Sequence, residues 1–243
     1  DDSGLTWSER GVNLAMQNWS SISMSDDGQY IVAAPTYGYV CTSFDGGVTW
    51  VEQTVAGNTN WYTLASSSDG QKVISGVSGS YIRTSSDGGV TWTQRDDSDR
   101  RSWRDIATSA DGSKIVAVTS ASIYDSYGGY IYTSSDGGVS WIERLDAGQA
   151  YWNGVLLSDD GNKIVAFDNL RNYVESNDFG ATWSAAAPVI DSHESDSFTG
   201  YAASNDLSKV ILSEREGRIV ISDAATAPNG AYIYNKTGED TSL

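Results

Sequence analysis

Five aromatic residues recur at equivalent places along the chain, each six residues before a serine. The set consists of Trp19, Trp61, Trp103, Trp152 and Phe198. Polar side chains flank the rings, Arg104 and Asn153 among them. An exposed ring beside amide or guanidinium groups can stack on a sugar while its neighbours bind the hydroxyl groups. We therefore predict that these aromatics, Arg104 and Asn153 bind a ligand, with an aromatic wedge between sheets as the alternative for the rings.

A second candidate is the loop from Arg95 to Arg104, which carries Arg95, Arg100, Arg101 and Arg104 close to Trp103. A guanidinium group binds carboxylate or sulfate in bidentate geometry, so this loop could capture an anionic partner. The alternative is that the aspartates of the same loop neutralise the arginines on the surface.

No set of side chains is arranged for catalysis in an obvious way. His193 is the only histidine, and without a Gly-x-Ser-x-Gly elbow we expect it to be an exposed loop residue. The 32 acidic residues could supply a facing carboxylate pair, yet no spacing singles one out. Transition-metal ligands are too few, and there is no Asp-x-Asp-x-Asp-Gly calcium loop. We expect no catalytic residue, no metal site and no cofactor.

The formal net charge of −17 limits the classes of partner. Affinity for nucleic acid rests on clustered Lys and Arg, so we expect no nucleic-acid binding, and the same charge argues against anionic membranes. No apolar run is long enough for a membrane span, and we expect no membrane insertion. Cys41 is the only cysteine and cannot form an internal disulfide.

The elements that position these residues follow from a repeat. The motif Ser-x-Asp-x-Gly-x-Thr-Trp occurs at Ser43–Trp50, Ser85–Trp92, Ser134–Trp141 and Ser176–Trp183, and its end is present at Asp2–Trp7. Ser140 replaces the Thr in the third copy. A period of roughly 40 to 50 residues with short alternating strands is typical of a β-propeller blade. The sequence therefore predicts an all-β fold, a single five-bladed β-propeller.

The motif resembles the Asp-box, or BNR repeat, of sialidases, sortilin-type receptors and photosystem II assembly-factor propellers. The resemblance implies a structural turn, far from the active face, for Asp2, Asp45, Asp87, Asp136 and Asp178. Sialidases also have an Arg-Ile-Pro segment near the start of the chain, which is absent here. They have one blade more than the five predicted for this chain. Tachylectin, a lectin with one sugar site per blade, is similar in blade number and repetition only.

Laying the repeats on one another predicts blades at 18–54, 60–96, 102–145, 151–186 and 197–223, followed by a C-terminal tail over 224–243. The last blade lacks its own box, so we expect residues 5–10 to form its outer strand and close the ring. The segment 231–234 also has strand character and could compete for that edge, which would leave the N-terminal strand to pair with a neighbouring molecule. The third blade carries an insertion over 120–127, a candidate protein interface.

Together these features favour a non-catalytic binding module with repeated sites near the blade rims, and carbohydrate is the favoured ligand. A partner protein, in an interaction or assembly scaffold, is the alternative, and a glycoside hydrolase is the third hypothesis. Acidic composition and the usual placement of Asp-box proteins favour an extracytoplasmic location, whether secreted, periplasmic or in an organelle lumen.

Overall fold

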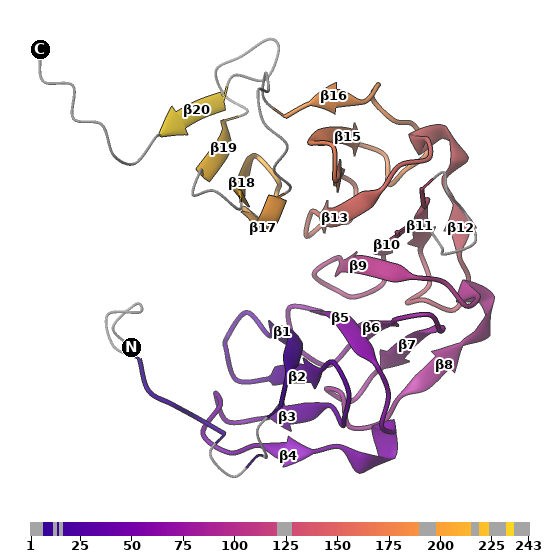
Figure 1. Cartoon of the computed structure of the whole chain (residues 1–243). Coiled ribbons are helices and arrows are strands. Elements are labelled where there is room, and N and C mark those ends of the chain that lie inside the picture. Colours follow the sequence, from indigo (N-terminus) through magenta and orange to yellow (C-terminus); the bar gives the residue numbers. More distant parts are fainter. Residues whose placement is uncertain are drawn as a thin grey trace, which may run out of the picture.

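The computed structural model describes residues 7–11, 14, 17–120, 128–189, 198–214, 219–223 and 232–235. Within these residues the chain forms five four-stranded antiparallel sheets, with three 3₁₀ turns between strands. The sheets are arranged in a ring, as Figure 1 shows. The prediction of an all-β five-bladed β-propeller is confirmed.

Each blade is one sheet, numbered in chain order. Blade 1 consists of β1 (Trp19–Met24), β2 (Ile31–Pro35), β3 (Cys41–Ser43) and β4 (Val51–Glu52). Blade 2 consists of β5 (Trp61–Ser66), β6 (Val73–Val77), β7 (Ile82–Ser85) and β8 (Thr93–Arg95). Blade 3 consists of β9 (Trp103–Thr108), β10 (Ile115–Thr119), β11 (Ile131–Ser134) and β12 (Ile142–Glu143).

Blade 4 consists of β13 (Trp152–Leu157), β14 (Ile164–Asp168), β15 (Asn172–Ser176) and β16 (Ala187–Pro188). Blade 5 consists of β17 (Phe198–Ala203), β18 (Lys209–Glu214), β19 (Ile219–Asp223) and β20 (Tyr232–Asn235). The 3₁₀ turns η1 (Thr54–Ala56), η2 (Asp96–Ser98) and η3 (Leu145–Ala147) follow β4, β8 and β12. None of the helices among the described residues is long and apolar enough to cross a membrane.

The turn between the third and fourth strands is held by hydrogen bonds among the Ser, Asp and Thr of the repeated motif. The Ser43 hydroxyl donates to Asp45 Oδ1 at 2.9 Å and accepts from the Gly47 N–H at 2.9 Å. Asp45 also accepts from the N–H of Thr49 at 2.8 Å and from its hydroxyl at 2.6 Å. These bonds, led by the Thr49 hydroxyl, lower the pKa of Asp45 to about 2.

The same hydrogen bonds recur in blades 2, 3 and 4, centred on Asp87, Asp136 and Asp178. These aspartates are hydrogen-bonded within their own turns, and their predicted role as structural Asp-box residues stays a prediction. Asp2 lies outside the described residues.

Backbone hydrogen bonds join neighbouring blades at the turn after each inner strand. Asp26 N–H donates to Ser68 O, and Ser68 N–H donates to Ala110 O. The series continues through Asp159 to Asn205, so it links all five blades in order.

The fourth strand of blade 5 differs from the expectation. Strand β20 pairs with β19, with Ile219 opposite Asn235 and Ser222 opposite Tyr232, so it occupies the edge that we assigned to residues 5–10. Residues 7–11 have no strand conformation. A strand that follows β19 after a short connection loses little loop-closure entropy, whereas the N-terminal segment must be brought from the other end of the chain. The predicted tail over 224–243 therefore contains a strand, and the competing segment prevails.

Candidate binding site at the channel mouth

Every inner strand carries a β-bulge directly after its aromatic residue. The pairing between the first two strands shifts register there in all five blades, so that one residue per blade is skipped. The skipped residues are Ser20, Tyr62, Arg104, Asn153 and Thr199. A bulge re-aims the side chain of the extra residue.

All five bulge residues line one cavity of about 570 Å³. The other lining residues are Ser21, Thr63, Asp105, Phe198 and Tyr201. Because residues of every blade contribute, the cavity is the mouth of the central channel. It is the place where one side chain from each repeat converges, and we refer to it as the channel mouth.

Arg104 is the only cationic residue among those that line the channel mouth. Its Nε and Nη2 atoms donate to Asn153 Oδ1 at 3.2 and 2.8 Å, and Nη1 donates to the Tyr62 hydroxyl. Its guanidinium carbon lies 5.6 Å from the centroid of the Tyr62 ring. Contacts from blades 2 and 4 thus fix the guanidinium group of blade 3, while the side chain stays exposed.

Asp105 lies next to Arg104 in the sequence and is partly buried. Its carboxylate accepts from the Val155 N–H at 2.8 Å, from the Thr63 hydroxyl at 3.2 Å and from the Tyr201 hydroxyl. Burial raises the pKa of Asp105, and the hydrogen bonds oppose this rise. The carboxylate oxygens are committed to partners on three other blades, so Asp105 organises the channel mouth.

Tyr201 reaches Asp105 by passing over blade 4, where residue 154 is a glycine. A Cβ atom on Gly154 would lie 2.7 Å from Tyr201 Cζ, too close for any side chain. Burial, followed by the charge of Asp105, raises the pKa of the Tyr201 hydroxyl, which therefore stays protonated as a donor.

Four of the five predicted ligand-binding aromatics are placed between blades. Trp61, Trp103, Trp152 and Phe198 are buried. Trp61 Nε1 donates to Gly38 O at 3.2 Å and Trp103 Nε1 to Ser80 O at 3.0 Å, in both cases on the preceding blade. These rings cannot offer a face to a sugar, and the wedge alternative describes them. Trp19 differs, with 47% of its surface exposed.

Arg104 and Asn153 are brought together at the channel mouth, while their role toward a ligand stays a prediction. Sequence reasoning missed Tyr62, Asp105 and Tyr201 as members of this site. A signal for Asp105 existed, because the equivalent positions in the other repeats hold Ser21, Thr63, Gly154 and Gly200, none of them charged.

The arginine-rich loop is partly neutralised by its own aspartates. Arg101 pairs with Asp99 at 3.1 Å and lies over the Tyr132 ring at 4.5 Å. Arg95 donates through Nε to Thr84 at 2.7 Å. These contacts favour the alternative in which the loop is a solvated surface, with Arg104 as the exception.

Among the described residues, no three or more His, Cys, Asp or Glu side chains gather where they could hold a metal ion. His193 and residues 121–127 of the insertion lie outside the described residues, and their predicted roles stay predictions.

No protein-family model matches the chain, and no curated protein matches its sequence. YCF48 from Cyanidioschyzon merolae superimposes with a TM-score of 0.63 and 15% identity, over 91% of this chain and 73% of that chain. YCF48 bound to D1 peptide gives a TM-score of 0.62 and 16% identity, over 89% of this chain and 67% of that chain.

The GH74 enzyme of Niastella koreensis gives a TM-score of 0.67 and 15% identity over 88% of this chain, which spans only 38% of that enzyme. A chain of a nidogen/laminin complex gives a TM-score of 0.66 and 10% identity, over 85% of this chain and 76% of that chain. At these identities the likeness shows the β-propeller fold alone.

Proposed function

We propose that this chain is a non-catalytic binding module for a partner protein, and that its channel mouth receives a carboxylate group of a peptide segment. The observation that carries the proposal is the fixed position of Arg104. A guanidinium group has five N–H groups, and three donor atoms of Arg104 hold Asn153 and Tyr62. The two remaining N–H groups suit a carboxylate, which an arginine binds in a defined orientation.

The lining favours a peptide over a sugar. Sugar binding by stacking needs an exposed ring, and four of the five repeated aromatics are buried, while the exposed one, Trp19, does not line the channel mouth. Tyr62 contributes a ring to the channel mouth, but Arg104 lies over it. Two of the structural neighbours are complexes with a peptide or a protein, YCF48 with D1 peptide and nidogen with laminin. This coincidence supports a protein partner as the class of ligand.

A hydrolase fits the channel mouth less well. Glycoside hydrolysis ordinarily needs two carboxyl groups on opposite sides of the bond that breaks. Asp105 is the only acidic residue among the described residues that line the cavity, and its oxygens are bound to Val155, Thr63 and Tyr201. Membership of the Asp-box class and an extracytoplasmic location are parts of the same proposal.

An array of acidic, neutral and basic peptides, each with a free or an amidated C-terminus, tests this function. We expect the wild type to select peptides with a carboxylate group. Arg104→Gln removes the charge but keeps hydrogen-bonding groups, and it should weaken binding at least about 10-fold. Arg100→Gln, at an exposed arginine that does not line the channel mouth, is the matched control.

Equal binding by Arg104→Gln and the wild type would refute the proposal. A glycan array run in parallel gives the competing outcome. If a sugar binds and Arg104→Gln abolishes that binding while no peptide is selected, the channel mouth is a carbohydrate site and the assignment to a protein partner is wrong.

A further inference from the structure

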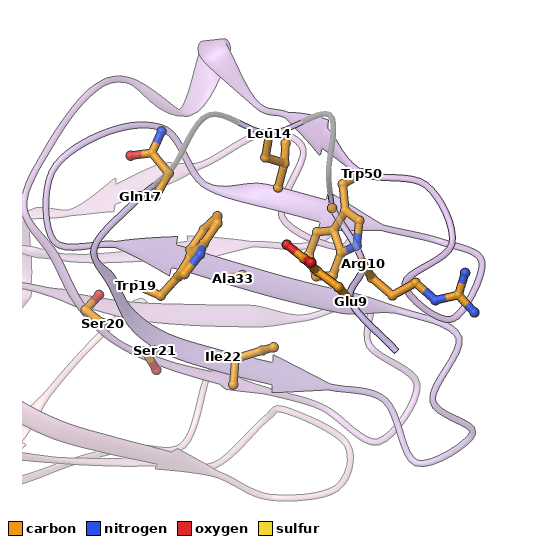
Figure 2. Close-up of a pocket in the computed structure, with 11 residues that line it drawn as sticks. Glu9, Arg10, Leu14, Gln17, Trp19, Ser20, Ser21, Ile22, Ala33 and Trp50 are labelled. Carbon is orange, nitrogen blue, oxygen red and sulfur yellow. The ribbon is translucent and has the colours of Figure 1, made fainter. Parts of the chain in front are cut away.

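The face of blade 1 that bears Trp19 is partly exposed among the described residues. Trp19 is 47% exposed and Ile22, on the same strand, is 67% exposed, whereas the equivalents of Trp19 in the other blades are buried. Figure 2 shows Leu14, Trp19, Ile22 and Trp50 around a hollow on this face, which has a volume of about 710 Å³. An exposed apolar area of this kind marks an interaction surface.

The other four blades show what covers such a face. In each case the aromatic shares a core cluster with aliphatic or aromatic side chains that lie on or directly beside the second and third strands of the preceding blade. Trp61 shares a core with Val32 and Val40, and Trp103 shares one with Ile74 and Ile82. The natural cover for Trp19 is therefore a blade that presents aliphatic or aromatic side chains at these two positions, as Val32 and Val40 or Ile74 and Ile82 do.

Blade 5 presents such a face, and its side chains are exposed in the part of the chain that the structure describes. Ile211 follows Lys209 and Val210 as Ile74 follows Lys72 and Val73 in blade 2. Ile211 is 42% exposed and Ile219, on the third strand, is 52% exposed. The chain thus carries two partly exposed faces whose side chains match those of its own internal interfaces.

The two faces do not meet within one molecule as far as the described residues show. The series of backbone bonds between blades runs from Asp26 to Asn205, and no bond of this series returns from Asn205 to blade 1 among the described residues. Figure 1 shows blade 5 separated from blade 1 on the open side of the ring. Within the described part of the chain, no extensive contact joins these blades.

We propose that the Trp19 face of blade 1 docks the Ile211 face of blade 5 from a second copy of this chain. The contact is head-to-tail, because two different faces meet, so it can continue from copy to copy or close into a ring. It would repeat the packing that joins successive blades inside one molecule. Since each copy carries a net charge of −17, mutual repulsion opposes docking, and added salt strengthens it.

Analytical ultracentrifugation over a range of protein and salt concentrations tests the proposal. We expect the wild type to associate as the concentration rises, more strongly at high salt. Ile22→Glu and Ile211→Glu each place a charge on one of the two faces, and each alone should weaken association at least about 10-fold. Leu145→Glu, at an exposed residue of η3 in blade 3, is the control and should associate like the wild type.

A mixture of the two variants distinguishes head-to-tail docking from a symmetric contact. The Ile211→Glu variant keeps an intact Trp19 face, and the Ile22→Glu variant keeps an intact Ile211 face, so the mixture should form dimers that grow no further. A wild type that stays monomeric at all concentrations overturns the proposal. Full association of Ile211→Glu alone also overturns it, because the Trp19 faces would then pair with each other. Circular dichroism confirms that each variant is folded.

Discussion

The Tyr201 hydroxyl of blade 5 donates a hydrogen bond to the Asp105 carboxylate of blade 3, across the intervening blade 4. This bond joins the last blade to the middle of the ring. It also places a partly buried acidic group beside Arg104, the cation that we propose as the ligand contact. The bond therefore couples blades 3 and 5 across blade 4 at the channel mouth, which residues of all five blades line.

Gly154 makes the bond between Tyr201 and Asp105 possible, so its substitution should be costly. In Gly154→Ala the new methyl group would overlap the Tyr201 ring. We expect the free energy of unfolding to fall by about 1–3 kcal/mol, the usual cost of overpacking. Urea unfolding measures the change.

Gly200→Ala is the matched control for that experiment, because it lies at the same place in the bulge of blade 5. There the added Cβ would meet only Ser213 Oγ, at 2.9 Å, and a hydroxyl can rotate away. A loss as large as that of Gly154→Ala would show that the bulge backbone, and not the Tyr201 ring, is responsible.

The pH dependence of stability should reveal Asp105. Its pKa is raised in the folded state above the ordinary value of 3.8 by burial. Between these two values the folded state holds the proton more tightly, so the contribution of Asp105 to stability falls as the pH rises through this window. Asp105→Asn keeps an oxygen for Val155 and Tyr201, and it should remove this fall.

Thermal melting of the wild type and Asp105→Asn from pH 3 upward checks that prediction. The difference in melting temperature between the two should change in favour of the variant as the pH rises. A constant difference in melting temperature would mean that the pKa of Asp105 is the same in the folded and unfolded states.

The aspartates of the turns should affect the pH dependence of stability with the opposite sign to Asp105. The Thr182 hydroxyl and backbone N–H, with the Ser176 hydroxyl, lower the pKa of Asp178 to about 2. The stabilisation by this carboxylate is present above the unfolded value of 3.8 and is lost as the pH falls toward 2. Asp178→Asn should therefore lose less stability than the wild type between pH 4 and pH 2.

Melting temperatures of the wild type and of Asp178→Asn, measured between pH 4 and pH 2, test this prediction. Asp146→Asn, at an exposed aspartate of η3, is the control and should follow the wild type. An Asp178→Asn curve parallel to the wild type would contradict the role of these hydrogen bonds in acid sensitivity.

Cys41 should resist modification in the folded protein. It is fully buried on β3, and burial raises its pKa to about 11. The thiolate is the reactive form, so little of it exists at pH 8. We expect a thiol reagent to react with the unfolded chain at least about 100-fold faster than with the native protein. Similar rates would mean that blade 1 opens readily.

Repetition explains how much of this structure could be predicted from sequence. The motif around Asp45 is local, since its Ser, Asp, Gly and Thr contact one another within a few residues, and copies of it report the period of the blades. The burial of Trp61 is not local. It depends on Val32 and Val40 of the preceding blade, which a reading of one repeat cannot reveal.

The outer strand of blade 5 is a second feature that could not be predicted from sequence. Trp7 completes the motif in sequence, yet β20 pairs with β19. Two segments with strand character competed for one edge, and their relative free energies depend on chain connectivity as well as on composition. The bond between Tyr201 and Asp105 could not be predicted from sequence for a similar reason, because it joins blades 3 and 5 across blade 4 and requires Gly154 there.

The channel mouth is proposed to bind a carboxylate through Arg104. Calorimetric titration of the best acidic peptide from the array, and of the same peptide with that carboxylate converted to an amide, tests it most directly. We predict that the amide weakens binding to the wild type at least about 10-fold and has little further effect on Arg104→Gln, because the two changes remove the same interaction. Equal losses in the wild type and in Arg104→Gln would contradict the claim, since the carboxylate would then bind elsewhere.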